Sequence, residues 1–195
     1  MSKLPDFEGL AMTAKVAEGA RLEWLPLETL CYRRALAENR MRFELAPGAE
    51  MIGWDMLALG LPASGEVFDE GRYTQQIELP GVWLERGTID GSDTTLLQSP
   101  VGLAGRTVLG TMWFGAGTAI SAKRRDELLL AARDVISAHA LAPTAGCTSP
   151  HAEAVVLRLL AHRVEPAMEL LGAVWARWRE LGWGLQATAP RVWRT

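Results

Sequence analysis

Apolar and polar residues alternate along much of the first 115 residues, which is typical of β-strands. The segment 40–45 (RMRFEL) places Met41, Phe43 and Leu45 on one face and charged residues on the other. The segment 72–79 (RYTQQIEL) alternates in the same way. A period of two predicts strands with one face in water and one face in the core.

Two further segments complete the strand-rich part. The segment 82–89 (VWLERGTI) follows the turn signal Pro80-Gly81, so it is expected to form a hairpin with 72–79. The segment 107–115 (TVLGTMWFG) is apolar throughout. Such a run favours a strand covered on both faces.

The pattern changes to a helical period after Gly117. The segment 121–140 has Ser121 as a candidate N-cap and a stripe made of Leu128, Ala132, Val135 and His139. The segment 165–182 has Pro166 in its first turn and Gly182 at its expected end. Its expected buried face is Met168, Leu171, Val174 or Trp175, and Trp178. The segment 153–161 is compatible with a strand or a helical turn.

One phrase occurs twice. AEGARLEW (17–24) and APGAEMIGW (46–54) both contain Ala-x-Gly-Ala, and their glycines, Gly19 and Gly48, stand 29 positions apart. The repeat predicts consecutive rungs or hairpins stacked on each other, although Trp24 and Trp54 differ in register by one residue. Strands followed by helices indicate a mainly β fold, a layered or β-helical (solenoid-like) stack with two α-helices in the C-terminal third.

Length, net charge and cysteine content exclude several classes of protein. The chain has 195 residues and a net charge of −3, so it suits one domain and argues against a general nucleic-acid binder. The start lacks the features of a secretory signal, and no apolar run is long enough to span a bilayer. The two cysteines, Cys31 and Cys147, are expected to be free thiols in a reducing cytoplasm.

Motifs for catalysis are weak. Cys147 and His151 lie four positions apart, but a zinc site needs three or four converging ligands, so a loop cysteine and a surface histidine are the preferred interpretation. Ser64 lies in PASGE (62–66), which lacks the Gly-x-Ser-x-Gly elbow and is typical of a turn. No phosphate-binding glycine loop occurs.

Acidic residues beside tryptophans and turns are better candidates for a site. Glu28, Asp55 and Glu66 are hard oxygen donors that could hold a divalent cation weakly while it passes. The alternative is that each is an ordinary solvated charge. Apolar neighbours make Glu28 and Asp55 the most strongly expected to be partly buried, where an unpaired charge is costly.

Four motifs together resemble the UreD family of urease accessory proteins, called UreH in some organisms. They are GARLEWLPLETL (19–30), LAPGAEMIGWDMLALGLPASGEVFDEGRYTQQIEL (45–79), LLQSPVGLAGRTVLGTM (96–112) and APRVWRT (189–195). They occur in the family order over nearly the whole chain, which would make residues 1–195 a single UreD-like domain, strand-rich over 1–118 and helix-containing over 119–195. The chain begins almost at the first motif, whereas family members usually carry a further N-terminal β segment. That segment is either absent from the protein, lost because the start was placed late, or trimmed, and a protein without it would have an uncovered sheet edge.

The resemblance implies a scaffold with no catalysis of its own. UreD-like proteins help to load nickel into apo-urease together with UreF and the GTPase UreG, and their fold is a β-helical stack with a helical layer. Glu28, Asp55 and Glu66 match acidic positions of the family motifs and become candidate nickel-path residues. No permanent cofactor is implied, only transient nickel. The implied partners are UreF-like and UreG-like proteins and urease apoprotein, in the cytoplasm, with a homodimer allowed and with no nucleic acid or membrane.

Two other functions compete with this one. A β-rich carbohydrate-binding module would stack sugars on exposed tryptophans such as Trp24 and Trp54. A small hydrolase would use Ser64 or Cys31 as its nucleophile. Exposure of these side chains separates the alternatives.

Overall fold

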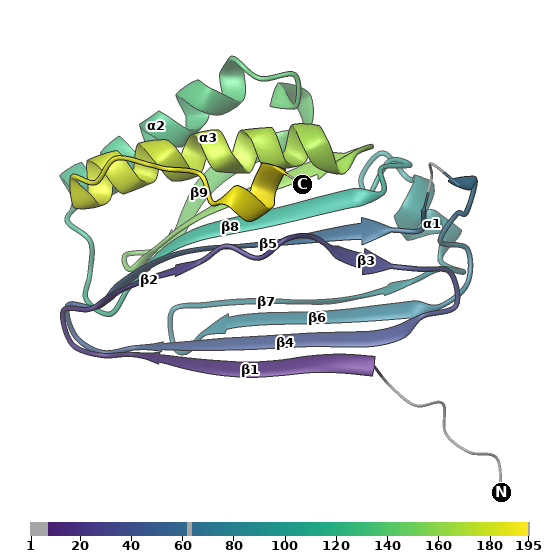
Figure 1. Cartoon of the computed structure of the whole chain (residues 1–195), viewed down its shortest axis with the longest axis horizontal. Helices are drawn as coiled ribbons and strands as arrows, with labels where there is room; N and C mark the ends of the chain where they lie inside the picture. Colours follow the sequence, from purple (N-terminus) through teal and green to yellow (C-terminus); the bar gives the residue numbers. More distant parts are fainter. Residues whose placement is uncertain (1–7, 62–63, 195) are drawn as a thin grey trace, which may run out of the picture.

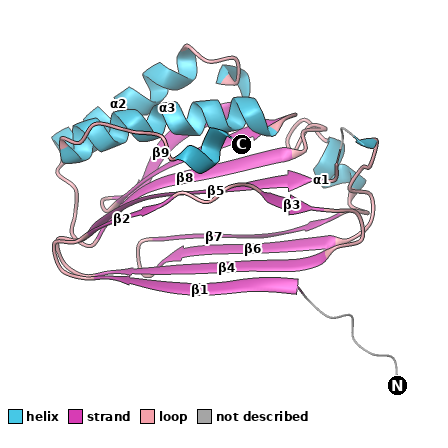
Figure 2. Ribbon diagram, in the orientation of Figure 1, coloured by secondary structure: helices cyan, strands magenta, loops and turns pink. Residues whose placement is uncertain are grey.

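The computed structural model describes residues 8–61 and 64–194, which form three stacked layers (Figures 1 and 2). The first sheet contains, in order, β1 (Glu8–Val16), β4 (Leu36–Leu45), β6 (Arg72–Leu79) and β7 (Trp83–Asp90). The second sheet contains β2 (Arg21–Trp24), β5 (Glu50–Leu59), β8 (Val108–Ala116), β10 (Ala154–Ala161) and β9 (Ala145–His151), and β3 (Thr29–Cys31) also pairs with β5. The long helices α2 (Ala122–Ser137) and α3 (Val164–Trp183) form the third layer on the outer face of the second sheet.

The described residues also contain three short helices. They are α1 (Thr94–Gln98), the 3-10 helix η2 (Ala142–Thr144) and the 3-10 helix η3 (Arg191–Arg194). The expected mainly β, layered fold is therefore confirmed. No helix among the described residues has both the length and the apolar character needed to cross a bilayer.

The repeated phrase marks two stacked rungs. The chain passes from β1 in the first sheet to β2 in the second, and again from β4 to β5. Both crossings are four-residue turns whose glycines, Gly19 and Gly48, have φ of +67° and +72°, a conformation that favours glycine. The strands pair in parallel at the spacing of the repeat: Glu8 lies opposite Ala37 and Arg21 opposite Glu50, each 29 positions later. Stacked rungs were predicted, and they are present.

The one-residue difference between Trp24 and Trp54 places the two rings on opposite faces of the second sheet. Trp24 pairs with Gly53, the residue before Trp54. Successive side chains of a strand point to opposite faces, so Trp24 packs toward the first sheet and Trp54 toward the helices. The two phrases therefore form equivalent turns and strands, but their tryptophans do not occupy equivalent positions in the core.

The second sheet is buried on both faces, as predicted for 107–115. Met112 and Phe114 of β8 pack beneath the helices, whereas Trp113 packs between the sheets. The first sheet has one solvent-exposed face, as the alternation of apolar and polar residues predicted. Met41 and Ile77 are buried in the sandwich, while Arg42 on the outer face forms ion pairs with its neighbours.

Both long helices begin where the sequence predicted, but their C-terminal ends differ from the prediction. Ser121 caps α2 by accepting the N–H of Arg124 at 3.3 Å, as expected. However, α2 ends at Ser137, and its buried stripe is Leu128, Ala131, Ala132 and Ile136, so His139 does not belong to it. Gly182 lies inside α3, and the cap is Gly184, with φ of +66°. The ambiguous segment 153–161 is strand β10.

Among the described residues, the strands nearest the N-terminus form an open edge of each sheet. There, β1 pairs only with β4, while β2 and β3 pair only with β5.

Candidate functional site: a polar layer inside the β-sandwich

A buried carboxylate lies between the two sheets. Asp55 on β5 is 4% exposed, and its Oδ1 accepts a hydrogen bond from Nδ2 of Asn39 on β4 at 3.2 Å. Its Oδ2 accepts a second hydrogen bond from Nε2 of Gln75 on β6. Apolar clusters fill the sandwich on either side of these residues, so the three side chains form a polar layer across an otherwise apolar interior.

Burial changes the proton affinity of this carboxylate. Loss of hydration raises the pKa of Asp55 to about 6, opposed by the hydrogen bond from Gln75 and reinforced by the nearby charge of Glu85. The hydrogen bond from Asn39 also lowers the pKa. The Asp55 carboxyl can therefore gain or lose a proton at a pH close to 6.

The polar layer continues to the protein surface. Thr111 on β8 lies directly opposite Asp55, and its Oγ1 donates to Oε1 of Glu85 on β7 at 3.1 Å. Nε of Arg158 on β10 donates to the other oxygen of Glu85 at 2.8 Å. The ion pair between Glu85 and Arg158 joins the two sheets, and the Arg158 side chain is largely exposed. Polar side chains thus extend from the strand position opposite Asp55 to the protein surface.

Two polar atoms in this layer lack a hydrogen-bond partner among the described residues. They are Oδ1 of Asn39 and the hydroxyl of Tyr73, both buried. Burial, together with the charge of Asp55, raises the pKa of Tyr73, and this rise is opposed by polar interactions with Asn39 and Thr29. Buried orphan oxygens are commonly met by an ordered water or an ion, so the layer is chemically suited to a hydrated species.

The other two predicted path residues lie elsewhere. Glu28 is half-buried in the loop between β2 and β3 and lines a groove beside α3. Glu66 is exposed in the turn after β5, where its N–H and C=O pair with Leu61. Residues 62–63 of the PASGE turn lie outside the described residues. Partial burial of Glu28 and Asp55 is confirmed, but within the described chain no three His, Cys, Asp or Glu side chains gather into a metal site.

The cysteines do not form a site. Cys147 lies in strand β9, not in a loop as the sequence suggested, and His151 at the end of that strand is exposed. Burial raises the pKa of Cys147 to about 12 and that of Cys31 to about 11. Both are free thiols, as expected. The shift disfavours the thiolate, which argues against Cys31 as a nucleophile.

Trp24 and Trp54, the two tryptophans considered for sugar stacking, are also unsuited to it. Trp54 is fully buried, and its Nε1 donates to the carbonyl of Pro26 at 2.8 Å. Trp24 is partly buried and packs against Phe43 between the sheets, with ring centroids 6.1 Å apart. A sugar platform needs an exposed ring face, so the carbohydrate-binding alternative finds no support at these residues.

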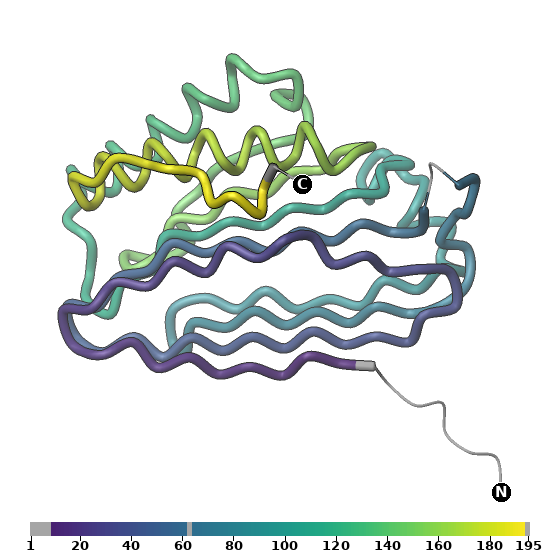
Figure 3. Tube along the Cα trace, in the orientation of Figure 1, coloured from purple at the N-terminus to yellow at the C-terminus, as the bar shows by residue number. Residues whose placement is uncertain are grey.

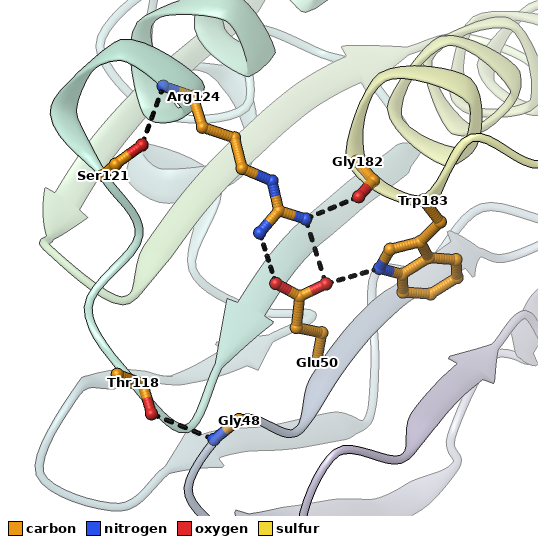
Figure 4. Close-up of polar contacts among 7 residues, drawn as sticks. All are labelled: Gly48, Glu50, Thr118, Ser121, Arg124, Gly182 and Trp183. Atoms are coloured by element: carbon orange, nitrogen blue, oxygen red, sulfur yellow. Dashed lines mark hydrogen bonds and ion pairs between the residues drawn. The ribbon is translucent and has the colours of Figure 1, made fainter.

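A second polar cluster fastens the helices to the sheet (Figure 4). Glu50 on β5 accepts hydrogen bonds from Arg124 of α2 and from Nε1 of Trp183 of α3, the latter at 2.7 Å. Arg124 also donates to the carbonyl of Gly182 at 2.7 Å. Burial alone would raise the pKa of Glu50, but Arg124 and Trp183 lower it overall. The carboxylate is fully paired, so we assign this cluster a structural role.

Sequence reasoning missed most of the polar layer, although a signal was present. Asn39 and Gln75 occupy the same alternation phase as the buried residues Met41 and Ile77. Glu85 likewise shares the phase of Trp83. Polar residues at core positions of three strands indicate a buried polar network, because an unpaired polar group inside a sandwich is costly.

Comparison with known proteins identifies the family. The model of the family described as "UreD urease accessory protein" matches residues 8–194. Proteins named urease accessory protein UreD are similar to this chain: that of Leptothrix cholodnii is 58% identical over 182 residues, that of Paracidovorax citrulli 58% over 180, and that of Variovorax paradoxus 56% over 181.

These alignments cover most of this chain but only part of the relatives. They include 93%, 92% and 93% of the chain, and 66%, 65% and 66% of the respective relatives. The chain thus spans slightly less than two thirds of the length of these proteins. With a family match over almost its whole described length, the chain belongs to the UreD family of urease accessory proteins.

Proposed function

We propose that this chain acts as a non-catalytic scaffold in urease maturation, where it helps to deliver nickel into apo-urease together with UreF-like and UreG-like proteins. The observation that carries the proposal is the family match over residues 8–194. Nickel is the cargo in this scheme, and the chain needs no resident cofactor.

The polar layer supports a role for the interior in handling the cargo. Asp55 is a buried oxygen donor, and Thr111, which lies opposite it on β8, begins a series of polar contacts to Glu85 and Arg158 at the surface. Carboxylates, a hydroxyl and an amide oxygen bind a divalent cation weakly enough to release it, especially where no full ligand set is assembled. We therefore place Asp55 at the centre of the proposed nickel path, and treat Glu28 and Glu66 as separate surface positions that could act before or after it.

The test is urease activation by the complete accessory set. Apo-urease, UreF, UreG and this chain would be combined with nickel and GTP, and both urease activity and nickel bound per urease would be measured. We expect Asp55→Asn and the double variant Glu28→Ala/Asp55→Ala to lower nickel loading while the complex still elutes as one species. Glu127→Gln on the exposed face of α2 is the matched control and should load nickel normally.

Two results would count against different parts of the proposal. Normal nickel loading by both Asp55 variants would remove the interior carboxylate from the path. Failure of the unmodified chain to associate with the accessory proteins or with apo-urease would overturn the scaffold role itself.

A further inference from the structure

A large groove lies beside α3, away from the polar layer. It has a volume of about 550 Å³ and lies between the loop before β3, the first turns of α3 and the segment that ends in η3. Figure 3 shows this C-terminal segment doubling back along α3. The residues that line it, here called the α3 groove, are Leu27, Glu28, Val164, Glu165, Met168, Glu169, Ala189, Val192 and Trp193.

The floor of the α3 groove is apolar and firmly supported. The ring of Trp193 packs against Trp54 at 4.9 Å and against Trp175 at 5.1 Å between centroids, so it is backed by the main core. Leu27 and Val192 at the groove are nevertheless 43% and 49% exposed. Large aliphatic side chains left open beside a pocket mark a surface that another chain can cover.

The groove extends beyond its main hollow. A second hollow of about 340 Å³ shares Glu28, Val164 and Glu165 with it and reaches the ends of β5 and β8. Leu30, which is 42% exposed, lines this extension. Together the two hollows offer an elongated apolar surface, a shape that suits a helix or an extended segment more than a small molecule.

The rim of the α3 groove is acidic. Its ionisable lining residues are Glu28, Glu165 and Glu169, and no Lys or Arg lines the main hollow. Arg163 pairs with Glu165 at 2.9 Å, and His139 lies 4.0 Å from Glu169. Glu28 forms no ion pair among the described residues. The carboxylates of Glu28 and Glu169 therefore border the apolar floor of the main hollow, whereas Arg163 and His162 line its extension.

We propose that the α3 groove docks an amphipathic segment of a partner protein whose apolar residues are flanked by Lys or Arg. The apolar floor would bury one face of the segment, and the glutamates would attract its basic residues. In this assignment Glu28 is a docking residue. Docking at this groove requires no metal, so it can be measured independently of nickel transfer.

The experiment uses the full chain and a defined probe. The probe is a fluorescent helical peptide of about 18 residues made of Leu and Lys at amphipathic spacing. Its binding is followed by anisotropy at low and high salt, beside a peptide in which Glu replaces every Lys. The groove variant is Glu28→Lys/Glu169→Lys. The matched control is Glu18→Lys/Glu127→Lys, which makes the same charge change at exposed positions elsewhere.

We expect the basic peptide to bind the unmodified chain and the control variant with similar affinity, and the groove variant at least ~10-fold more weakly, because like charges then face each other. Leu27→Asp should weaken binding as well, and the acidic peptide should not bind. Circular dichroism would verify that each variant is folded. A peptide that fails to bind, or that binds the groove variant as well as the control, overturns the proposal. A dimer of the unmodified chain that dissociates on Leu27→Asp would instead assign the groove to a second copy.

Discussion

The indole N–H of Trp175 donates a hydrogen bond to Oε1 of Glu23 at 2.7 Å, across 152 positions of sequence. The same arrangement recurs two helical turns later, where Trp183 donates to Glu50 at 2.7 Å. Glu23 belongs to the first rung and Glu50 to the second, so α3 spans both rungs through one carboxylate on each. Each carboxylate also accepts from an arginine, Arg179 or Arg124.

The Glu50 anchor predicts a measurable coupling. Glu50→Ala would leave the half-buried Arg124 and the N–H of Trp183 without an acceptor, so we expect the free energy of unfolding to fall by ~2–3 kcal/mol. Arg124→Met alone should also destabilise the fold, because it leaves the carboxylate without its cation. The double variant should lose less than the sum of the single losses. Urea unfolding of all four proteins measures this cycle, and additive losses would show that the pair is not coupled.

The raised pKa of Asp55 predicts a specific pH dependence. The folded-state pKa of about 6 lies above the ordinary value of 3.8 for an aspartate, so the folded chain binds the proton more tightly than the unfolded chain does. The contribution of Asp55 to stability is thus fully present below pH 3.8 and is lost as the pH rises through 6. Asp55→Asn removes this dependence. We expect the stability of the variant relative to the unmodified chain to increase by up to ~3 kcal/mol between pH 4 and pH 7.5.

The Asp55→Asn measurement compares free energies of unfolding at matched pH, so titrations common to both proteins cancel. Two curves that remain parallel from pH 4 to pH 7.5 would show that the Asp55 carboxyl titrates normally. An Asn39→Asp variant provides a useful contrast. It adds a second carboxyl beside Asp55 and should make the loss of stability at neutral pH larger.

The influence of Glu85 on Asp55 can be tested separately. The negative charge of Glu85 is one cause of the raised pKa, so Glu85→Gln should lower the pKa of Asp55 while retaining an acceptor for Thr111. The midpoint of the Asp55-dependent stability change should then move to lower pH. NMR titration of the Asp55 carboxyl carbon reads the same shift directly. An unmoved midpoint would mean that the charge of Glu85 does not contribute to the raised pKa of Asp55.

Much of the fold could be predicted because local patterns and tertiary environment agree in it. The alternation at 40–45 and 72–79 predicted that the first sheet has one solvent-exposed face. The repeated turn predicted the 29-residue spacing between paired strands. The end of α3 was missed for a tertiary reason. Gly182 lies under Phe114, where a Cβ would come within 2.9 Å of the ring, so this glycine serves close packing and the helix continues to Trp183.

The candidate site was harder to predict than the fold. Asp55 follows a tryptophan in an apolar run, which made its burial predictable. Its partners Asn39 and Gln75 come from two strands of the other sheet, and no local pattern indicates which strands will face each other. The α3 groove was beyond sequence reasoning as well, because it forms only where the C-terminal segment returns to α3 and the loop before β3.

Two strand glycines differ in the space around them, and this difference predicts opposite tolerance to substitution. A Cβ on Gly53 of β5 would lie 2.4 Å from the ring of Trp113, whereas a Cβ on Gly87 of β7 would meet no atom within 4 Å. Gly53→Ala should force Trp113 to move inside the sandwich and cost ~1–3 kcal/mol of unfolding free energy. Gly87→Ala, the matched control, should be neutral or slightly stabilising, since alanine restricts the unfolded chain. Thermal unfolding followed by tryptophan fluorescence measures both variants. Equal melting temperatures for the two would contradict the close contact between β5 and the Trp113 ring.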